Sequence, residues 1–330
     1  MNNLAFLKNK TVLVTGGTGT FGRAFVSKLL RESDVKKIII FSRDEFKQSQ
    51  MQADLKEHAK KLRFFIGDIR DLSRLERAFE GVDIVFHAAA LKQVPAIEYN
   101  PFEAVKTNIL GSQNVIEAAL DNNIDKAILI SSDKAVQPVN LYGATKLAAE
   151  RLFIAANSYS GRNTKFGVVR YGNVIGSRGS LVEMIKQQKD KGEIALTDKE
   201  MTRFWISIDK VLNIILEAVS NMQGGELFVP KMKSLKVLDV IKYLAPKCKI
   251  KLVGIRPGEK MHETLITEYE AKRTIDLKNV YVIKPEFDFS NRGGWLNDKA
   301  LVDQNFNYSS NNPEFLLSLE KAEEILGEFI

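Results

Sequence analysis

Short apolar runs alternate with stretches of helical spacing through the first half of this 330-residue chain. The runs cover residues 11–15, 37–41, 62–66, 84–88, 127–130 and 166–169. Helical spacing covers residues 23–32, 71–79 and 105–122. Strands that alternate with helices predict right-handed βαβ crossovers. We therefore expect an α/β fold with a Rossmann-type, doubly wound parallel sheet, and a ligand outside the carboxyl ends of its strands.

The alternation weakens after about residue 172. Residues 173–205 are rich in glycine, serine and polar side chains, and a helical pattern then covers 209–222. Short strands are expected at 226–229, 249–253 and 281–283, with helices at 237–244 and 313–329. We predict a smaller α/β substrate-binding lobe from residues 173–204 and 226–330. The cofactor-binding domain then holds residues 1–172 together with about 205–225, because that helix can pack back on the sheet.

Composition excludes several classes of protein. No apolar run reaches the roughly 20 residues that a membrane span needs, so no membrane association is expected. One cysteine, Cys248, excludes an internal disulfide framework and favours a cytoplasmic location. The three histidines lack the spacing of metal ligands, so we expect no metal.

The net charge of +7 calls for an acidic partner. The basic residues are spread along the chain and alternate with acidic ones, with no basic tail and no nucleic-acid-binding motif. A phosphorylated small molecule needs only a few focused cations. It is therefore favoured over nucleic acid as the partner.

A glycine-rich turn joins the first strand to the first helix. Its sequence is Thr15-Gly16-Gly17-Thr18-Gly19-Thr20-Phe21-Gly22. Small residues let the backbone approach a pyrophosphate, and the helix N-terminus supplies free N–H donors. The turn predicts a nicotinamide dinucleotide site, with Gly16, Thr18, Gly19, Thr20, Phe21 and Gly22 as contacts. The alternative is a tight turn with no ligand.

The end of the second strand bears on the choice of cofactor. An acid at this place would bind the ribose hydroxyls of NAD, but Ser42 is uncharged and Arg43 follows it. An arginine fork suits a 2′-phosphate, and Lys47 can assist. We therefore expect NADP rather than NAD, although Asp44 complicates this interpretation and Arg43 is alternatively a solvated loop cation.

The third and fourth strands end in residues that fit the rest of a dinucleotide. Asp68 and Ile69 are expected at the adenine, although Asp68 is nearly as well explained as a helix cap. The small side chains of Ala88 and Ala90 leave room for the cofactor. His87 is expected to be a core or hinge residue and not a catalyst.

Tyr142 and Lys146 form a candidate reactive pair. They are four residues apart and share one face if the segment is helical. A nearby ammonium favours phenolate, so we expect Lys146 to lower the pKa of Tyr142 and make it a base toward an alcohol. Ser132, at the end of the fifth strand, is expected to steady the substrate oxygen.

Taken together, the glycine turn, Ser132, Tyr142 and Lys146 resemble the extended short-chain dehydrogenase/reductase superfamily over nearly the whole chain. Asp133-Lys134 narrows the resemblance, because eliminating water needs an acid for the leaving hydroxyl and a base for a carbon proton. Sugar-nucleotide 4,6-dehydratases often have Asp-Glu here. Asp-Lys, with the segment 141–146, looks like the inverting UDP-N-acetylglucosamine 4,6-dehydratases of pseudaminic acid biosynthesis. That family has Ser-Thr-Asp-Lys where this chain has Ser131-Ser132-Asp133-Lys134, which keeps the hydroxyl.

Further blocks of sequence carry the same resemblance. They are residues 42–45 (SRDE), 90–95 (ALKQVP), 170–174 (RYGNV), 201–206 (MTRFWI) and 256–260 (RPGEK). The resemblance places Lys92 at both cofactor and substrate, Asn173 and Arg178 at the diphosphate or sugar, and Arg256 and Glu259 at the uridine diphosphate end. Each of these could instead be a surface residue or part of a salt bridge. Phe204 and Trp205 are expected in the core, and a symmetric homo-oligomer is expected because related enzymes form one.

The resemblance also implies a reaction cycle. Tyr142, assisted by Lys146, accepts the C4 hydroxyl proton while hydride passes to NADP. Lys134 removes the C5 proton if it is neutral, and burial near Lys146 and Lys92 is expected to depress its pKa. Asp133 protonates the leaving C6 hydroxyl, and hydride returns to C6 with inversion at C5. The product would be UDP-2-acetamido-2,6-dideoxy-β-L-arabino-hex-4-ulose.

Two other functions stay open from the sequence. One is a UDP-sugar 4-epimerase or a simple dehydrogenase on the same scaffold, which does not need Asp133-Lys134. The other is a non-catalytic NADP-binding protein. Such proteins usually lose the tyrosine or the lysine, and this chain keeps both.

Overall fold

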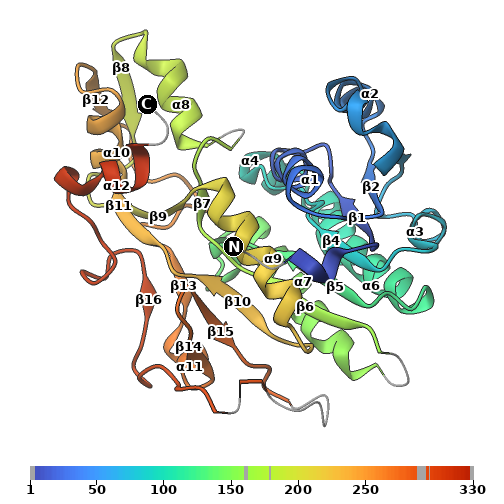
Figure 1. The fold of residues 1–330 in the computed structure, drawn as a ribbon. Helices are drawn as coiled ribbons and strands as arrows, with labels where there is room; N and C mark the ends of the chain where they lie inside the picture. The colour runs from blue at the N-terminus through green and yellow to red at the C-terminus, as the bar shows by residue number, and fades with distance from the viewer. Residues whose placement is uncertain (1–3, 160–162, 178–179, 288–294, 297, 328–330) are drawn as a thin grey trace.

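A computed structural model describes residues 4–159, 163–177, 180–287, 295–296 and 298–327 (Figure 1). Arg178, one of the expected substrate contacts, lies outside the described residues. A large sheet with helices on both faces forms one side of the molecule, and a smaller group of short sheets and helices forms the other.

Among the described residues, nine strands form the large sheet in the order β14-β15-β10-β6-β5-β4-β1-β2-β3. Its strands are β1 (Thr11–Thr15), β2 (Lys37–Ser42), β3 (Leu62–Ile66), β4 (Ile84–His87), β5 (Lys126–Ile130), β6 (Lys165–Val169), β10 (Leu227–Pro230), β14 (Thr274–Asp276) and β15 (Val280–Ile283). The pairs from β3 to β10 are parallel, and β15 and β14 are added antiparallel at the edge. The predicted doubly wound parallel sheet is therefore confirmed.

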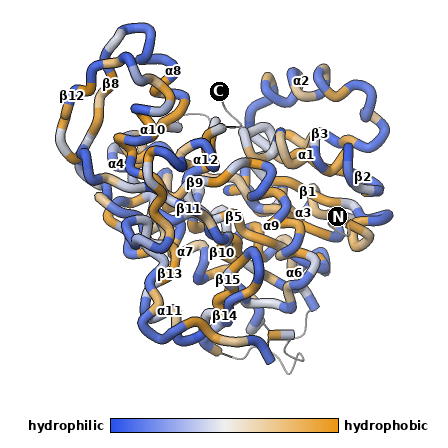
Figure 2. The backbone as a smooth tube through the Cα atoms, turned by 60° about the vertical axis from the view of Figure 1, so that its left-hand side comes forward, coloured by the Kyte–Doolittle hydropathy of each residue, from blue (hydrophilic) through white to orange (hydrophobic). Residues whose placement is uncertain are grey.

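Helices cover both faces of this sheet because its strands are apolar on both sides. One face carries α1 (Thr20–Glu32) and α9 (Ile208–Asn221), and the other carries α3 (Leu72–Phe79), α6 (Gly111–Asp121) and α7 (Leu141–Ala155). Figure 2 shows apolar residues along the strands and mostly hydrophilic residues along α2 (Glu45–Asp54), a helix that was not predicted from the sequence.

The second lobe is built from short sheets around its own apolar cluster, which includes Ile185, Trp205 and Leu235. It contains β7 (Asn173–Val174), β9 (Thr202–Ile206) and β11 (Lys233–Lys236) in one sheet and β8 (Glu193–Leu196) with β12 (Lys249–Leu252) in another. Its longer helices are α8 (Leu181–Lys189) and α10 (Val237–Leu244). The remaining elements are η1 (Leu4–Leu7), η2 (Lys56–Lys61), α4 (Val94–Tyr99), α5 (Pro101–Ala104), η3 (Val105–Leu110), η4 (Asp133–Ala135), η5 (Ala156–Ser158), β13 (Thr264–Ile266), α11 (Glu268–Ala271), β16 (Tyr308–Ser309), η6 (Leu319–Lys321) and α12 (Glu323–Leu326).

Three expectations about these elements need correction. The sequence analysis assigned residues 226–330 to the second lobe, but β10, β14 and β15 hydrogen-bond into the large sheet. The helix expected over 105–122 begins with the π-helical segment η3 before α6. The segment of the helix expected over 313–329 is described only to residue 327, and short pieces replace the helix there because the backbone of Phe315 and Leu317 pairs with Ser234 of β11.

Candidate active site

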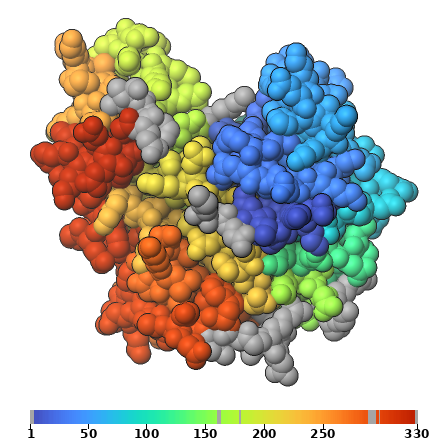
Figure 3. Space-filling view, viewed as in Figure 1, coloured from blue at the N-terminus to red at the C-terminus, as the bar shows by residue number. Residues whose placement is uncertain are grey.

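A cavity of about 1000 Å³ lies at the carboxyl ends of the parallel strands, where the doubly wound fold predicts a ligand. Figure 3 shows the surface hollowed between the α1–α2 side and the α8–β8 side. Its walls include the expected residues Gly16, Thr18, Gly19, Thr20, Phe21, Ser42, Arg43, Asp44, Lys47, Asp68, Ile69, Ala88, Ala90, Lys92, Ser132, Asp133, Lys134, Tyr142, Lys146 and Asn173. Residues predicted for the cofactor and for the chemistry therefore share one cavity.

The glycine turn fits a dinucleotide pyrophosphate. Gly19 is the N-cap of α1 and lines the cavity together with Thr20, so the N-terminal end of the helix, with its backbone N–H groups and dipole, faces the space that a pyrophosphate would fill. Gly22 does not line the cavity, but a Cβ there would lie 2.4 Å from the backbone of Gly17. Gly22 thus lets the turn pack tightly on the helix that presents those donors.

The tip of β2 carries one exposed cation. The Arg43 side chain is 53% exposed and lies 3.8 Å from the Asp68 carboxylate. Asp44 caps α2 by accepting a hydrogen bond from the Lys47 backbone N–H, and its carboxylate also pairs with the Lys47 ammonium at 2.6 Å. The acid that complicated the sequence analysis is therefore engaged by its own helix.

His87 has the structural role expected of it. It is buried at the end of β4, with hydrogen-bond contacts to Thr15 Oγ1 at 2.7 Å and Ser112 Oγ at 3.1 Å. Burial, with a smaller effect of the Lys146 charge, lowers the pKa of His87 to about 3. A neutral histidine tied on both sides belongs to the core.

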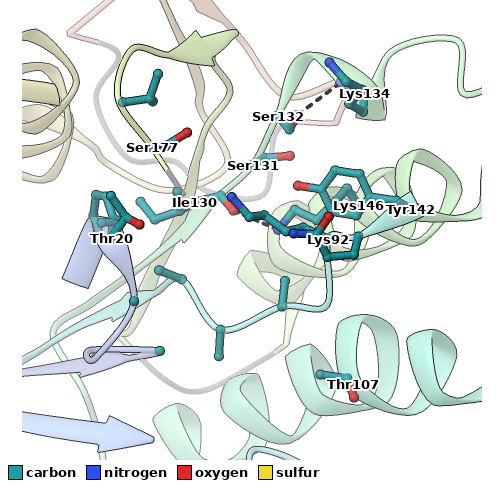
Figure 4. Close-up of a pocket in the computed structure, with 18 of the residues that line it drawn as sticks. Thr20, Lys92, Thr107, Ile130, Ser131, Ser132, Lys134, Tyr142, Lys146 and Ser177 are labelled. Carbon is teal, nitrogen blue, oxygen red and sulfur yellow. Dashed lines mark hydrogen bonds between the residues drawn. The ribbon is translucent and has the colours of Figure 1, made fainter. Parts of the chain in front are cut away.

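The start of α7 packs closely against the turn η4, which carries Asp133 and Lys134. Asn140 caps the helix by accepting from the Gly143 N–H at 2.8 Å. A Cβ on Gly143 would lie 2.2 Å from the Lys134 carbonyl oxygen, so only glycine allows the helix to approach the turn η4 this closely. Figure 4 shows Tyr142 and Lys146 extending from α7 beside the tip of β5, with Ser132 and Lys134 above them.

The expected effect of Lys146 on Tyr142 is corrected by the geometry. Lys146 donates to the Ile130 carbonyl at 2.7 Å, and burial lowers its own pKa to about 8. Burial raises the pKa of Tyr142 to about 12, and the Lys134 charge and a hydrogen bond with Ser132 offset this only in part. The cation that favours the phenolate here is Lys134.

The expected depression of the Lys134 pKa is also wrong for this arrangement. Its ammonium lies 3.1 Å from both carboxylate oxygens of Asp133 and 2.9 Å from Glu263. Burial alone would lower the pKa of Lys134, but the two carboxylates outweigh it and hold the pKa above its usual value. The charges that act most strongly on Lys134 are those of Asp133, Glu263 and Arg203.

Some expected substrate contacts lie elsewhere. Arg256 is exposed, and its backbone N–H lies 3.4 Å from the Glu259 carboxylate; neither side chain lines the cavity. The loop that carries them does reach α7, since the Gly258 carbonyl accepts from Asn140 at 2.8 Å.

Glu263, Thr107 and Trp205 are among the residues of this region that the sequence did not indicate. Glu263 contacts Lys134, yet nothing in their spacing indicates that they meet. Thr107 and Trp205 both line the cavity, and the Thr107 hydroxyl and Trp205 indole N–H have no hydrogen-bond partner among the described residues. Trp205 and Phe204 are nearly fully buried, as expected of core residues.

Two further features, a metal site and a membrane-spanning helix, are not found among the described residues. No group of three His, Cys, Asp or Glu there could hold a metal ion. No described helix is long and apolar enough to cross a membrane.

The fold, the glycine turn and the Tyr142–Lys146 pair define a Rossmann-type protein of the extended short-chain dehydrogenase/reductase class. Residues 12–285 match the family described as "Polysaccharide biosynthesis protein". The chain belongs to this family.

Similar proteins extend over nearly the whole chain. A Campylobacter jejuni protein named UDP-N-acetylglucosamine 4,6-dehydratase (inverting) is 46% identical, with 96% of this chain and 97% of that protein covered. A Rickettsia canadensis protein named UDP-glucose 4-epimerase is 40% identical, with 96% and 95% covered. The X-ray structure of Pen from Bacillus thuringiensis superposes with a TM-score of 0.90 at 37% identity over 98% of both chains.

Proposed function

We propose that this protein is a hydro-lyase that catalyses NADP-dependent 4,6-dehydration of UDP-N-acetylglucosamine with inversion at C5. The observation that carries the proposal is the acid–amine pair Asp133–Lys134, hydrogen-bonded at 3.1 Å inside the cavity that also holds Tyr142. Oxidation at C4 alone needs no such pair, whereas elimination of water needs both an acid and a base. The name of the 46% identical Campylobacter relative agrees with this chemistry.

NADP is the cofactor that the cavity favours. The glycine turn and the first turn of α1 would hold the pyrophosphate, and Arg43 would bind the 2′-phosphate. Asp44 is paired with Lys47, which offsets the negative charge that it would otherwise place near a 2′-phosphate. When bound, the nicotinamide supplies a hydride acceptor for C4 and returns the hydride to C6.

Tyr142 takes the C4 hydroxyl proton. Burial and the Asp133 charge raise the pKa of Tyr142, and the Lys134 charge and a hydrogen bond with Ser132 oppose that rise. The Ser132 hydroxyl donates to the Asp133 carboxylate at 2.7 Å and accepts a hydrogen bond from the Lys134 backbone N–H at 3.2 Å. The serine thus fixes the turn on which acid, amine and phenol meet.

The Asp133–Lys134 pair reaches its reactive form by an internal proton transfer. The Lys134 ammonium passes one proton to the Asp133 carboxylate, which gives a neutral amine and a carboxylic acid together. The amine then takes the C5 proton, the C5–H electron pair forms the C5=C6 bond, and the C6 hydroxyl takes the Asp133 proton and leaves as water. The pair returns to ammonium and carboxylate, so the elimination consumes no external acid or base. Return of hydride to C6 is accompanied by uptake of a proton at C5 on the face opposite Lys134, which inverts C5.

Substrate binding is assigned to the part of the cavity beyond the nicotinamide. Lys92 and Asn173 line it and suit the diphosphate or sugar. Residues 173–204, together with the part of 226–330 outside the large sheet, would form the substrate-binding lobe. A homo-oligomer remains the expected assembly.

A 4-epimerase of a UDP-sugar is the second candidate, favoured by the 40% identical Rickettsia relative of that name. Incubation with UDP-N-acetylglucosamine and NADP, followed by mass spectrometry and proton NMR of the product, separates the two. A dehydratase gives a product lighter by one water. A product of unchanged mass with an inverted C4 hydroxyl would overturn the dehydratase proposal, and no turnover of any UDP-sugar would favour the non-catalytic alternative.

A further inference from the structure

Lys134 is held by two carboxylates that come from distant parts of the chain. Asp133 is its neighbour in the turn η4, whereas Glu263 precedes β13 in the later half of the chain. The Lys134 ammonium lies 2.9 Å from Glu263 Oε1 and 3.1 Å from Asp133. The second carboxylate has no part in the reaction steps described so far.

Glu263 is buried, and its backbone is held by hydrogen bonds. Its side chain is 1% exposed. Its backbone N–H donates to Ser310 Oγ at 2.9 Å, and its carbonyl accepts from the Ser310 N–H at 2.8 Å. Ser310 Oγ in turn lies 2.6 Å from the hydroxyl of Thr202 on β9. The carboxylate is therefore fixed by the framework of the second lobe.

Two other cations face Glu263, but both have further partners. Arg203 Nε is 3.9 Å away, and its guanidinium also donates to the carbonyls of Thr202, Met261 and Lys260. Lys260 is 3.4 Å from Oε2 and donates to the Val136 carbonyl at 2.6 Å. Among the described residues, Oε2 has no hydrogen-bond partner, so the shortest polar contact of this carboxylate is with Lys134.

We propose that Glu263 is a positioning residue of the dehydration, which holds the Lys134 amine beside Asp133 at the tip of β5. The inference rests on the proposed function. A fixed anion beside the amine makes the transfer of its proton to Asp133 harder and its uptake of the C5 proton easier by the same amount, so the charge effect cancels over the two steps. The rate gain comes from the fixed position of the amine beside the substrate carbon. Glu263 stays ionised throughout and exchanges no proton with the substrate.

The charges around Lys134 set the direction in which its pKa moves when the Glu263 charge is removed. Asp133 and Glu263 favour the ammonium, and Arg203 opposes it. The hydroxyl of Tyr142 also lies within the range of its charge. Removal of the Glu263 charge leaves Arg203 uncompensated and makes the amine a weaker base.

The test compares Glu263→Gln with Glu270→Gln in the full chain. Glu270 is a matched control, because it is a buried acid that pairs with Arg170 at 3.0 Å and lies outside the cavity. Glu263→Gln should lower kcat by about tenfold or more with KM changed by less than about threefold, and should move the limb of the pH–rate profile that Lys134 governs to lower pH. Glu270→Gln should lower the melting temperature and leave the shape of the profile unchanged.

A second readout does not depend on turnover. The reaction of Lys134 with an amine-specific acylating reagent, measured by peptide mass spectrometry across pH, reports the protonation of that amine. Its midpoint should fall by about one pH unit or more in Glu263→Gln and stay in place in Glu270→Gln.

The outcomes separate two failures. If the wild type gives no dehydrated product, the proposed function fails. If the wild type is active but Glu263→Gln changes neither the labelling midpoint nor the pH profile, and behaves like Glu270→Gln, the positioning role is wrong and Glu263 is a structural ion-pair partner.

Discussion

Lys146 is a buried cation that the fold accommodates at a cost in stability. Its side chain is nearly inaccessible, and burial lowers its pKa to about 8 from a usual value of 10.5, although the Glu150 charge opposes the shift. Between these two pH values the unfolded chain binds more protons than the folded protein. Stability linked to Lys146 therefore rises with pH through this window, and the cost is largest below pH 8.

Lys146→Met should consequently be inactive but more stable than the wild type at pH 7. We expect a gain of about 1 kcal/mol, because relief of the buried charge exceeds the loss of the hydrogen bond to Ile130. Urea unfolding at pH 7 and at pH 10 measures this gain. The advantage should shrink at the higher pH; a variant that is less stable at pH 7, or a gain that does not depend on pH, would show that the charge is not the cause.

Arg43 should decide the choice of cofactor. Because its guanidinium would bind the 2′-phosphate, Arg43→Ala should weaken NADP binding by about tenfold or more and leave NAD binding nearly unchanged. Lys47→Ala should have a smaller effect, since Asp44 already neutralises that ammonium. Titration calorimetry with both cofactors tests this. An equal loss of NAD and NADP affinity in Arg43→Ala would contradict the NADP assignment.

The close packing of α7 against the turn η4 sets the position of Tyr142 relative to Asp133 and Lys134. The close approach of Gly143 to the Lys134 carbonyl brings Tyr142 to the acid–amine pair. Gly143→Ala forces these elements apart, and a displacement near 1 Å costs about 100-fold in rate. We expect kcat to fall by about that factor while NADP binding, measured by calorimetry, persists because the glycine turn lies on a different strand. Loss of both together would mean that the substitution disrupts the fold and not the site.

Much of this architecture is predictable from the sequence because it follows from local pattern. Strands β1 to β6 follow from β-branched apolar runs, and the glycine turn follows from its place between a strand and a helix. The cavity walls follow in turn, since parallel strands end on one edge. The α2 helix escaped prediction because its residues are mostly polar and show little apolar periodicity.

The electrostatics of the site could not be predicted in this way. Sequence spacing placed Lys146 near Tyr142, but it did not reveal that Lys146 donates to Ile130. The expected pKa of Lys134 was wrong because the carboxylates of Asp133 and Glu263 together outweigh burial, and Glu263 reaches the site through the second lobe. Likewise, residues 315–317 have a helical sequence pattern but pair with Ser234 of β11. This contact is with a distant part of the chain, so the local sequence does not indicate it.

At the scale of the whole molecule, buried ion pairs tie the later part of the chain to the large sheet. Arg170, directly after β6, pairs with Glu150 of α7 at 2.7 Å and with Glu270 of α11 at 3.0 Å. All three side chains are nearly inaccessible. This triad joins the segment that carries β14 and β15 to the helix that carries Tyr142.

Arg170→Met should therefore destabilise the whole protein. It leaves two buried carboxylates without their cation, which costs about 3–5 kcal/mol. Arg31→Met, which removes an exposed pair with Glu32, should change stability by about 0.5 kcal/mol or less. The urea midpoint of both variants gives the comparison, and similar small effects would mean that the triad contributes little to the coupling.

We propose that oxidation at C4, elimination of water across C5 and C6, and return of the hydride to C6 all take place in one cavity. Proton NMR of the reaction with UDP-N-acetylglucosamine in heavy water tests it most directly. The account predicts a 6-deoxy methyl signal, deuterium at C5 and no net consumption of NADP. A product that keeps its C6 hydroxyl and carries no deuterium at C5 would contradict it.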